Sequence, residues 1–381
     1  MRRRVGILAC AAAVLWPAAI SLAASKLPLP SRDVPSPMTR ARYVVEAIGK
    51  PSAMHGIHGL AIGPDGALYA GSLTGASIYR VDVTSGATTT FLGPPRGAAD
   101  DLAFAADGTV VWTGLGNGTV FARGRNGQVR SLAQGMSGAN AIAFSRDGRL
   151  FVSRIFGGDG LYELDLSGLR PPRTVAEKIG GLNAFQIADD GALYGPLFFR
   201  GKIVRIDIET GAIADVADGF ERPVAVKIEA DGNLIVLDYL RGDVVRVDPK
   251  SGRKTPLANL APPVDNLAIG KDGTIYVSST AYNGITAIDP KTSAQRRVTW
   301  GSFSAPGLLT MLDGTEKLLI ADAWGPRIFD PTTGDSTLIT RPRNSDGARC
   351  SNDALQSEKN PVCMKPTHAI MMNGATIHAR P

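Results

Sequence analysis

An Asp-Gly pair returns at a nearly constant interval along the chain and constrains the fold more than any other feature. Its seven aspartates are Asp65, Asp107, Asp147, Asp190, Asp231, Asp272 and Asp313, and successive ones lie 40 to 43 residues apart. A fixed period of this length is typical of repeat architectures, in which each unit is one supersecondary motif. We therefore expect one domain of repeated units, although 381 residues could hold two or three average domains.

Each repeat has the pattern of four short antiparallel strands. Apolar residues alternate before the Asp-Gly pair, as at Leu60 and Ile62, and this period of two is typical of a strand. The pair itself favours a hairpin turn, a second apolar strand follows, and a third ends in a D-x-x-x-G turn such as Asp82 to Gly86. Four strands in about 41 residues predict a propeller blade. The predicted fold class is all-β, a β-propeller of four-stranded blades with seven repeat units.

Ring closure leaves six or eight blades open as alternatives. Residues 41–48 have the pattern of an extra strand that could pair with the last blade. Residues 368–374 contain Asn-Gly in place of Asp-Gly and could begin an incomplete eighth unit. We take residues 41–341 as the propeller.

The segments outside the repeats have different patterns. Residues 1–23 combine three arginines, an apolar stretch and small residues before Ala24, which is typical of a secretory signal peptide. An uncleaved membrane anchor is the alternative. Residues 24–40 are expected to be a linker, and residues 342–381 a C-terminal extension in which an oxidising compartment would join Cys350 and Cys363. We expect a periplasmic or secreted protein without membrane attachment after cleavage.

Charge and motifs exclude several classes of function. The net charge is +6, but without residues 1–23 the chain keeps 38 basic and 35 acidic residues, so nothing indicates a nucleic-acid partner. The sequence contains no G-x-S-x-G elbow, Walker A loop, H-E-x-x-H helix or C-x-x-C pair. Serine-nucleophile and zinc chemistry therefore have no support in these patterns.

One position in each repeat is rich in polar residues. The innermost strand of a propeller blade lines the central channel, so residues at a fixed offset form a ring around the axis. The residues seven before each Asp are His58, Asp100, Asn140, Asn183, Val224, Asp265 and Pro306. Converging carboxylate and amide oxygens suit a hard cation such as calcium. Two alternatives stay open: Asn and Asp also bond local backbone at strand starts, and His58 could donate to a channel carbonyl.

These repeats resemble the senescence-marker-protein/gluconolactonase family of calcium-dependent lactonases, and more broadly the strictosidine-synthase-like and NHL-repeat propellers. Asn140 in GANAIAFSRDG and Asp265 in PVDNLAIGKDG match metal-binding positions of that family, and Asn183 fits a further amide ligand. The chain departs from the family in two ways. His58 stands where the family has a glutamate, and the family has six blades. Asp100 could supply the missing carboxylate from another blade.

The expected function is an exported hydrolase, a calcium-dependent lactonase or esterase acting on a small-molecule substrate at the channel mouth. Its divalent cation would be held by Asp100, Asn140, Asn183 and Asp265. Asp265 or His58 would handle the proton. Two alternatives remain: a non-catalytic propeller that binds a protein, glycan or small ligand, and a metal-free lyase or cyclase on the same scaffold.

Overall fold

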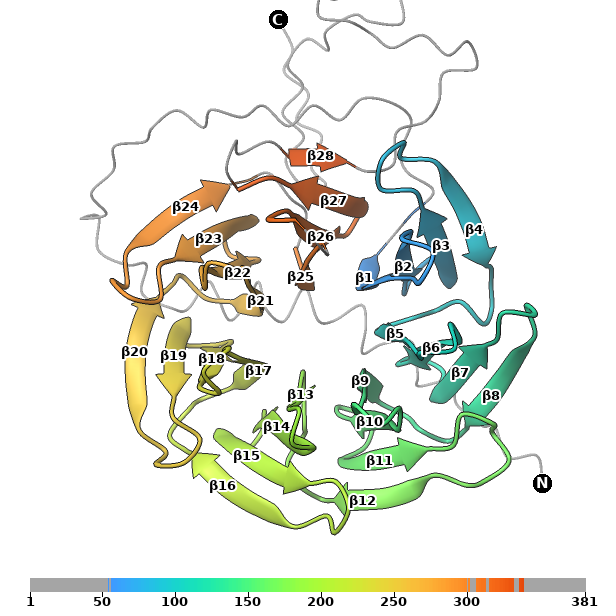
Figure 1. Ribbon diagram of the computed structural model, residues 1–381, viewed down its shortest axis with the longest axis horizontal. Helices are drawn as coiled ribbons and strands as arrows, with labels where there is room; N and C mark the ends of the chain where they lie inside the picture. The colour runs from blue at the N-terminus through green and yellow to red at the C-terminus, as the bar shows by residue number, and fades with distance from the viewer. Residues whose placement is uncertain are drawn as a thin grey trace, which may run out of the picture. The chain divides into compact units, whose positions relative to one another are not determined.

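Seven four-stranded antiparallel sheets follow one another around a ring (Figure 1). The computed structural model describes residues 54, 56–299, 301, 306–312, 315–331 and 336–338. In every sheet the four strands are consecutive in the chain and pair in sequence order. The prediction of an all-β propeller with seven blades is confirmed over the residues that the structure describes.

Each blade begins with its innermost strand and ends with its outermost one. The strands are β1 (Ile57–Ile62), β2 (Leu68–Ser72), β3 (Ser77–Val81) and β4 (Thr88–Leu92) in blade 1; β5 (Leu102–Phe104), β6 (Val110–Gly114), β7 (Thr119–Arg123) and β8 (Val129–Ala133) in blade 2; β9 (Ala139–Phe144), β10 (Leu150–Arg154), β11 (Gly160–Leu164) and β12 (Arg173–Glu177) in blade 3; β13 (Gln186–Ile187), β14 (Ala192–Leu197), β15 (Lys202–Asp207) and β16 (Ile213–Ala217) in blade 4; β17 (Pro223–Ile228), β18 (Leu234–Asp238), β19 (Asp243–Val247) and β20 (Lys254–Asn259) in blade 5; β21 (Val264–Ile269), β22 (Ile275–Ser279), β23 (Gly284–Ile288) and β24 (Gln295–Thr299) in blade 6; and β25 (Leu309–Met311), β26 (Leu318–Asp322), β27 (Gly325–Phe329) and β28 (Ser336–Leu338) in blade 7.

In blades 1 to 6 the Asp-Gly pairs form the predicted hairpin turns between the first and second strands. In blade 6 the carboxylate of Asp272 accepts hydrogen bonds from the backbone N–H of Thr274 at 2.9 Å and from its hydroxyl at 2.8 Å. Gly273 follows with φ of 87°, a conformation that glycine adopts without a steric cost. The same two residue types therefore explain both the turn and its recurrence in the sequence.

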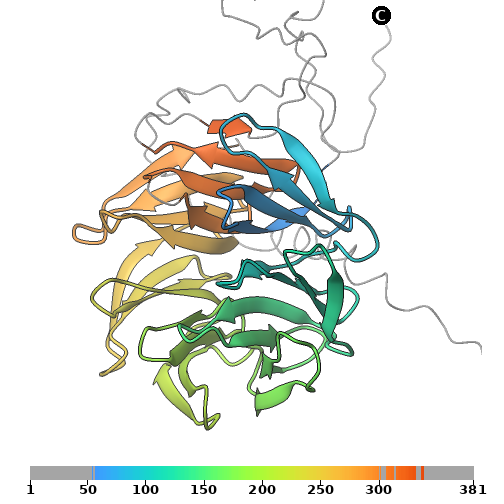
Figure 2. The same ribbon diagram turned by 45° about the vertical axis from the view of Figure 1, so that its right-hand side comes forward.

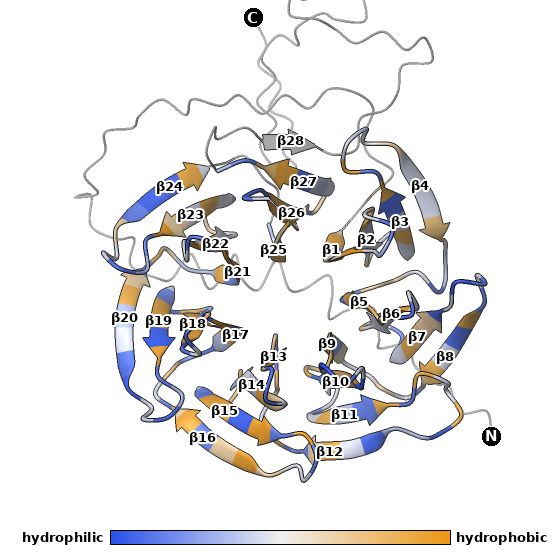
Figure 3. Cartoon of the chain, in the orientation of Figure 1, coloured by the Kyte–Doolittle hydropathy of each residue, from blue (hydrophilic) through white to orange (hydrophobic). Residues whose placement is uncertain are grey.

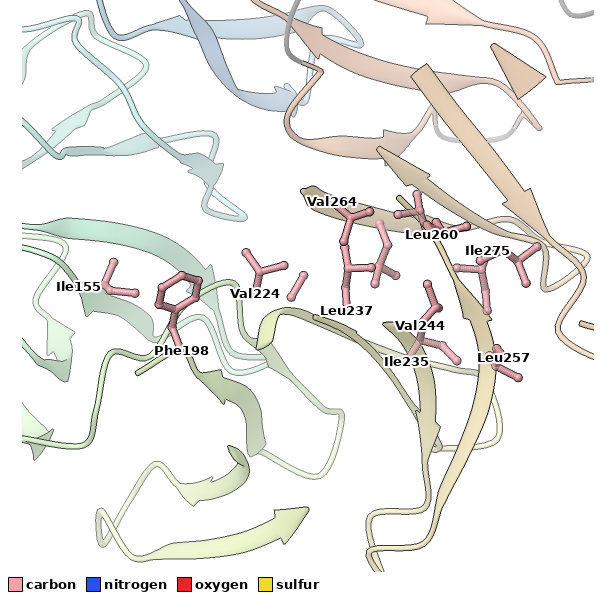
Figure 4. Close-up of a cluster of buried hydrophobic side chains, with 14 residues drawn as sticks. Ile155, Phe198, Val224, Ile235, Leu237, Val244, Leu257, Leu260, Val264 and Ile275 are labelled. Carbon is pink, nitrogen blue, oxygen red and sulfur yellow. The ribbon is translucent and has the colours of Figure 1, made fainter. Parts of the chain in front are cut away.

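Apolar side chains hold neighbouring blades together. Figure 4 shows one such cluster, in which Val224 of β17, Leu237 of β18 and Val264 of β21 join blades 5 and 6. In blade 2, Trp112 is fully buried and stacks on Phe121 with ring centroids 5.4 Å apart. The outermost strand of blade 6, β24, begins with three exposed hydrophilic residues (Figure 3). The core of the molecule thus lies between blades rather than inside one sheet.

Blades 1 and 7 meet and close the ring (Figures 1 and 2). The backbone N–H of Gly56 donates to the carbonyl of Ala323 at 2.7 Å. An apolar cluster joins Ile57 and Leu60 of blade 1 to Leu319 and Ala321 of blade 7. The ring therefore closes through direct contacts between its first and last blades.

Several sequence predictions fall outside the described residues. They concern the signal peptide at 1–23, the linker at 24–40, the extra strand at 41–48, and the C-terminal extension with the Cys350–Cys363 disulfide and residues 368–374. None of the described residues forms a helix able to cross a membrane.

Candidate functional site

The polar ring predicted from the repeat exists, with one change of register. The backbone N–H of Asp100 donates to the carbonyl of Thr113 in β6 at 2.9 Å, and in blade 7 Gly307 makes the equivalent bond to Ala321 in β26 at 2.9 Å. Gly307 therefore takes the position predicted for Pro306, because the Asp-Gly pair of blade 7 follows its inner strand one residue sooner. We call the seven equivalent positions the axial ring, and its members are His58, Asp100, Asn140, Asn183, Val224, Asp265 and Gly307.

Three members of the axial ring contact one another across blades 1, 2 and 3. Nδ1 of His58 lies 3.0 Å from the carbonyl oxygen of Asp100 and 3.3 Å from its Oδ1. Nδ2 of Asn140 donates to Oδ2 of Asp100 at 2.8 Å. Asp100 is only 2% exposed, whereas His58 is 46% exposed. The buried carboxylate is thus held between an amide and an accessible imidazole.

This contact orients the imidazole of His58. When Nδ1 carries a proton, it donates to Asp100, and Nε2 of the neutral ring becomes the acceptor. The predicted alternative in which His58 donates to a channel carbonyl is therefore realised at Asp100. The same contact is the one that prepares a histidine for general acid–base work, because a fixed tautomer leaves a defined basic nitrogen.

Neighbouring charges favour the protonated form of His58. Burial lowers its pKa, but Asp100 and Asp265 raise it by more, so the net pKa lies above the ordinary value for histidine. Burial also raises the pKa of the Asp100 carboxyl, which His58 and Asn140 partly offset. Protonation of His58 and ionisation of Asp100 therefore favour each other.

Asp265 of β21 is the second carboxylate of the site. Burial raises its pKa, the positive charge of His58 lowers it, and Asp100 raises it again. Its Oδ2 points toward blade 7, where it lies 3.5 Å from the place that a Cβ on Gly307 would occupy. The charges of His58 and Asp100 thus act on the Asp265 carboxyl.

Asn183 and Val224 do not join this polar group. Among the described residues no hydrogen bond connects the Asn183 side chain to the other ring members, and its backbone N–H donates to Pro196 at 3.1 Å. Blade 4 is irregular here, because β13 has only two residues. Val224 is 6% exposed and packs in the apolar cluster of Figure 4. Within the described part of the chain, no group of three or more His, Cys, Asp and Glu side chains is placed to hold a metal ion.

Two charged residues outside the predicted site lie beside the ring. Oδ2 of Asp101 accepts from the backbone N–H of Ile142 in blade 3 at 3.1 Å, which ties blades 2 and 3 together. Burial raises the pKa of Asp101 to about 6. Burial lowers the pKa of Lys227, and Asp101 partly offsets this. The sequence does contain a signal for both residues. Asp101 lies six residues before the Asp of its Asp-Gly pair and Lys227 lies four before, and most repeats have a small residue at these positions.

A group of aromatic residues near the ring also escaped the sequence analysis. Phe156, Phe198, Phe199 and Tyr239 come from the turns between the second and third strands of blades 3, 4 and 5. Asp238 fixes the last of these turns, because its fully buried carboxylate accepts backbone N–H groups from Glu221 at 2.6 Å and Leu240 at 3.2 Å. Phe198 and Tyr239 lie eight residues after the Asp of their Asp-Gly pair, and Phe156 and Phe199 lie nine after it, but the other repeats have no aromatic residue at these two positions.

The chain matches no family model and no curated protein. Solved structures do resemble it. A streptogramin B lyase has 17% identity and a TM-score of 0.63, over 73% of this chain and 94% of that one. A catalytically inactive histidine-to-alanine variant of virginiamycin B lyase from Staphylococcus aureus, solved with quinupristin, has 17% identity and a TM-score of 0.61, over 72% and 94%. The extracellular domain of a hybrid two-component system from B. thetaiotaomicron has 11% identity and a TM-score of 0.58, over 72% of this chain and 40% of that one.

At these identities the likeness concerns the fold alone. It agrees with the propeller part of the sequence resemblance, while membership of the senescence-marker-protein/gluconolactonase family is not shown. The chain is a seven-bladed β-propeller in which His58 and Asn140 of the axial ring contact the buried Asp100.

Proposed function

We propose that this protein is an exported enzyme that cleaves a C–O bond of a small ester or lactone, with His58 transferring the proton. The observation that carries the proposal is the contact of the accessible His58 with the buried Asp100, which Asn140 holds from the other side. The predicted signal peptide supports export. Two neighbours of the same fold are lyases, and one of them was solved as an inactive histidine variant, which supports cleavage at a histidine.

Asp100, His58 and Asp265 have different roles in the proton transfer. Asp100 accepts the Nδ1 proton, so that Nε2 can take a proton from the reactants. Asp100 and Asp265 then stabilise the imidazolium that forms. In hydrolysis the proton comes from water, whose oxygen bonds to the carbonyl carbon. The acyl C–O bond then breaks, and the imidazolium returns the proton to the departing alkoxide oxygen. In elimination it comes from the carbon beside the alkyl C–O carbon, a double bond forms, and the carboxylate leaves with the electron pair of the C–O bond.

The experiment compares the purified mature protein with its His58→Gln variant on lactones and aryl esters, in water enriched in ¹⁸O. We expect at least about a hundredfold lower kcat/KM in the variant, since positioned proton transfer contributes on that scale. Label in the carboxylate product indicates hydrolysis, and an unlabelled unsaturated product indicates elimination. Equal turnover by both proteins, or none on any substrate, would reject the proposal in favour of a non-catalytic binding propeller.

A divalent cation, calcium above all, is a second candidate, and a specific observation favours it. The negative charge of the buried Asp100 raises the pKa of Asp265. A cation would relieve this repulsion. The donor types fit, because Asp100, Asp265 and the amide oxygen of Asn140 are the oxygen ligands that calcium prefers, although Asn183 is not joined to them. When bound there, the cation would polarise a substrate carbonyl.

Removal of the cation tests this second candidate. Native protein and an Asp265→Ala variant are both chelated exhaustively, and their thermal unfolding is followed with and without calcium. Saturation at about a hundred times the dissociation constant should stabilise the native protein by about 2.7 kcal/mol and leave the variant unchanged. A native protein whose unfolding does not respond to calcium would exclude calcium binding at these residues.

A further inference from the structure

Four aromatic rings from three consecutive blades form one connected group, which we call the aromatic cluster. It consists of Phe156, Phe198, Phe199 and Tyr239. The ring centroids of the three phenylalanines lie 5.2 to 5.9 Å apart, at interplanar angles of 76° to 89°. The centroids of Phe198 and Tyr239 lie 6.2 Å apart. Edge-to-face packing of this kind is favourable between aromatic rings, so the cluster is a built feature and not a chance exposure.

One ring of the aromatic cluster, Phe198, is buried, and two, Phe156 and Phe199, are exposed. Phe198 is 9% exposed and lies beside Ile155 and Val224 in the apolar core of Figure 4. Phe156 and Phe199 are 49% and 50% exposed and stand edge-on to it. Two large apolar rings are thus fixed by a buried third ring while keeping half of their surface in contact with solvent.

The backbone of Phe156 has an unusual conformation. Its φ is +63°, in the left-handed region that bulky side chains rarely adopt. The neighbouring backbone fixes the turn, because Ile155 donates to Gly138 at 2.8 Å and Gly157 donates to Ile155 at 2.7 Å. Such strain persists when the surroundings impose it, and it concentrates at ligand-binding sites. In this turn it directs an exposed ring toward the aromatic cluster.

The aromatic cluster is continuous with the candidate site. Val224, which packs with Phe198, is itself a member of the axial ring. Tyr239 interacts electrostatically with Asp265, and its carbonyl accepts the backbone N–H of Val264, the residue before Asp265, at 3.3 Å. The axial ring therefore has polar side chains at blades 1, 2, 3, 4 and 6 and an apolar one, Val224, at blade 5, next to the aromatic cluster.

We infer that the aromatic cluster is a substrate subsite that holds a flat aromatic group, so that the substrate of this enzyme is an aryl-bearing or benzo-fused ester or lactone. The inference rests on the proposed function for the site of cleavage. A ring packed against Phe156 and Phe199 would leave its polar ester directed toward Asp265 and His58. Such a substrate has an apolar ring and a polar ester. The ring would contact the phenylalanines and the ester would lie near the polar residues of the axial ring, so each part would meet a surface of its own polarity.

The test uses two lactones with the same six-membered ester ring, dihydrocoumarin and δ-valerolactone, which differ by one fused benzene ring. The native protein should prefer dihydrocoumarin in kcat/KM. In the Phe156→Ala/Phe199→Ala variant this preference should fall about tenfold, mainly through a higher KM. The matched control is Ile213→Ala, which removes a 41% exposed apolar side chain from β16 and should keep the native preference.

A second measurement does not depend on catalysis. Saturation-transfer NMR follows 3-phenylpropionamide, which is not an ester, against propionamide. The phenyl protons should receive saturation from the native protein, the Ile213→Ala variant and His58→Gln, but not from the double phenylalanine variant. Phenyl binding without turnover would reject the proposed function and keep the aromatic subsite. Equal phenyl binding by the double variant, or an unchanged preference between the two lactones, would overturn the subsite.

Discussion

At the residue scale, one D-x-x-x-G turn has a serine, Ser293, in place of the glycine that ends the turn in other repeats. Asp82, Asp207 and Asp248 are each followed four residues later by a glycine, and these glycines have φ of 70° to 74°. In blade 6 the same turn runs from Asp289 to Ser293, and the serine has φ of 60°. The turn therefore keeps its backbone conformation although one residue has a side chain that resists it.

Ser293→Gly should stabilise the protein by about 0.5–1 kcal/mol, because glycine adopts this φ without a steric cost, while its greater freedom in the unfolded chain offsets part of the gain. Equilibrium unfolding in urea measures the change. Lys291→Gly in the same turn is the control and should lose stability, since Lys291 has no positive φ to relieve. A less stable Ser293→Gly protein would contradict the argument.

The residues of the candidate site were predicted only in part. The fixed offset from Asp-Gly placed His58, Asp100, Asn140 and Asp265 correctly, because the spacing within a blade is nearly constant. It could not give the direction of each side chain, which depends on how neighbouring blades pack. Asn183 illustrates this limit, since the short β13 of blade 4 leaves it without a hydrogen bond to the others in the described structure.

At the scale of elements, ion pairs connect the outer parts of blades 3 and 4. Glu163 of β11 accepts from Nε and Nη2 of Arg149, both at 2.8 Å, and from Nε of Arg173 at 2.7 Å. Arg149 also bonds Glu209 of blade 4. The Arg149 guanidinium lowers the pKa of the Glu163 carboxyl to about 2, against the opposing effect of burial.

This network should make stability depend on pH. The pKa of Glu163 falls from 4.5 when unfolded to about 2 when folded, so its contribution is complete above pH 4.5 and is lost as the pH falls toward 2. Glu163→Gln should lower the free energy of unfolding at pH 7 by on the order of 2 kcal/mol after solvent screening. Urea unfolding should show this difference shrinking between pH 5 and pH 3. A difference that stays constant over that range would contradict a lowered pKa of Glu163 in the folded protein. Asp215→Asn, which removes the exposed ion pair between Asp215 and Lys202, serves as control.

Elements were easier to predict than their contacts. The Asp-Gly turns and the alternation before them gave the first two strands of each blade. The turns between second and third strands share no residue types from blade to blade, so the repeat does not predict the aromatic cluster. The count of repeats correctly predicted the number of blades, because each repeat forms one blade by pairing strands that are adjacent in the sequence. It carries no information on contacts between blades.

At the scale of the whole molecule, the ring depends on the contact between blades 1 and 7. Leu319 of β26 is fully buried in the cluster that joins these blades. Leu319→Ala should lower the free energy of unfolding by about 2–5 kcal/mol, because it leaves a cavity at the closing interface. Urea unfolding measures the loss, with the 88% exposed Leu169→Ala as control. A loss below about 1 kcal/mol would mean that this interface does not hold the ring closed.

Chemical rescue of His58 tests the central claim most directly. The His58→Ala variant is assayed for lactone turnover with and without added imidazole, beside the native protein. Because the missing group would be a proton carrier, turnover should fall at least about a hundredfold in the variant and recover in proportion to the concentration of free imidazole. A variant that keeps native turnover, or one that stays inactive at every imidazole concentration while it folds normally, would contradict proton transfer at His58.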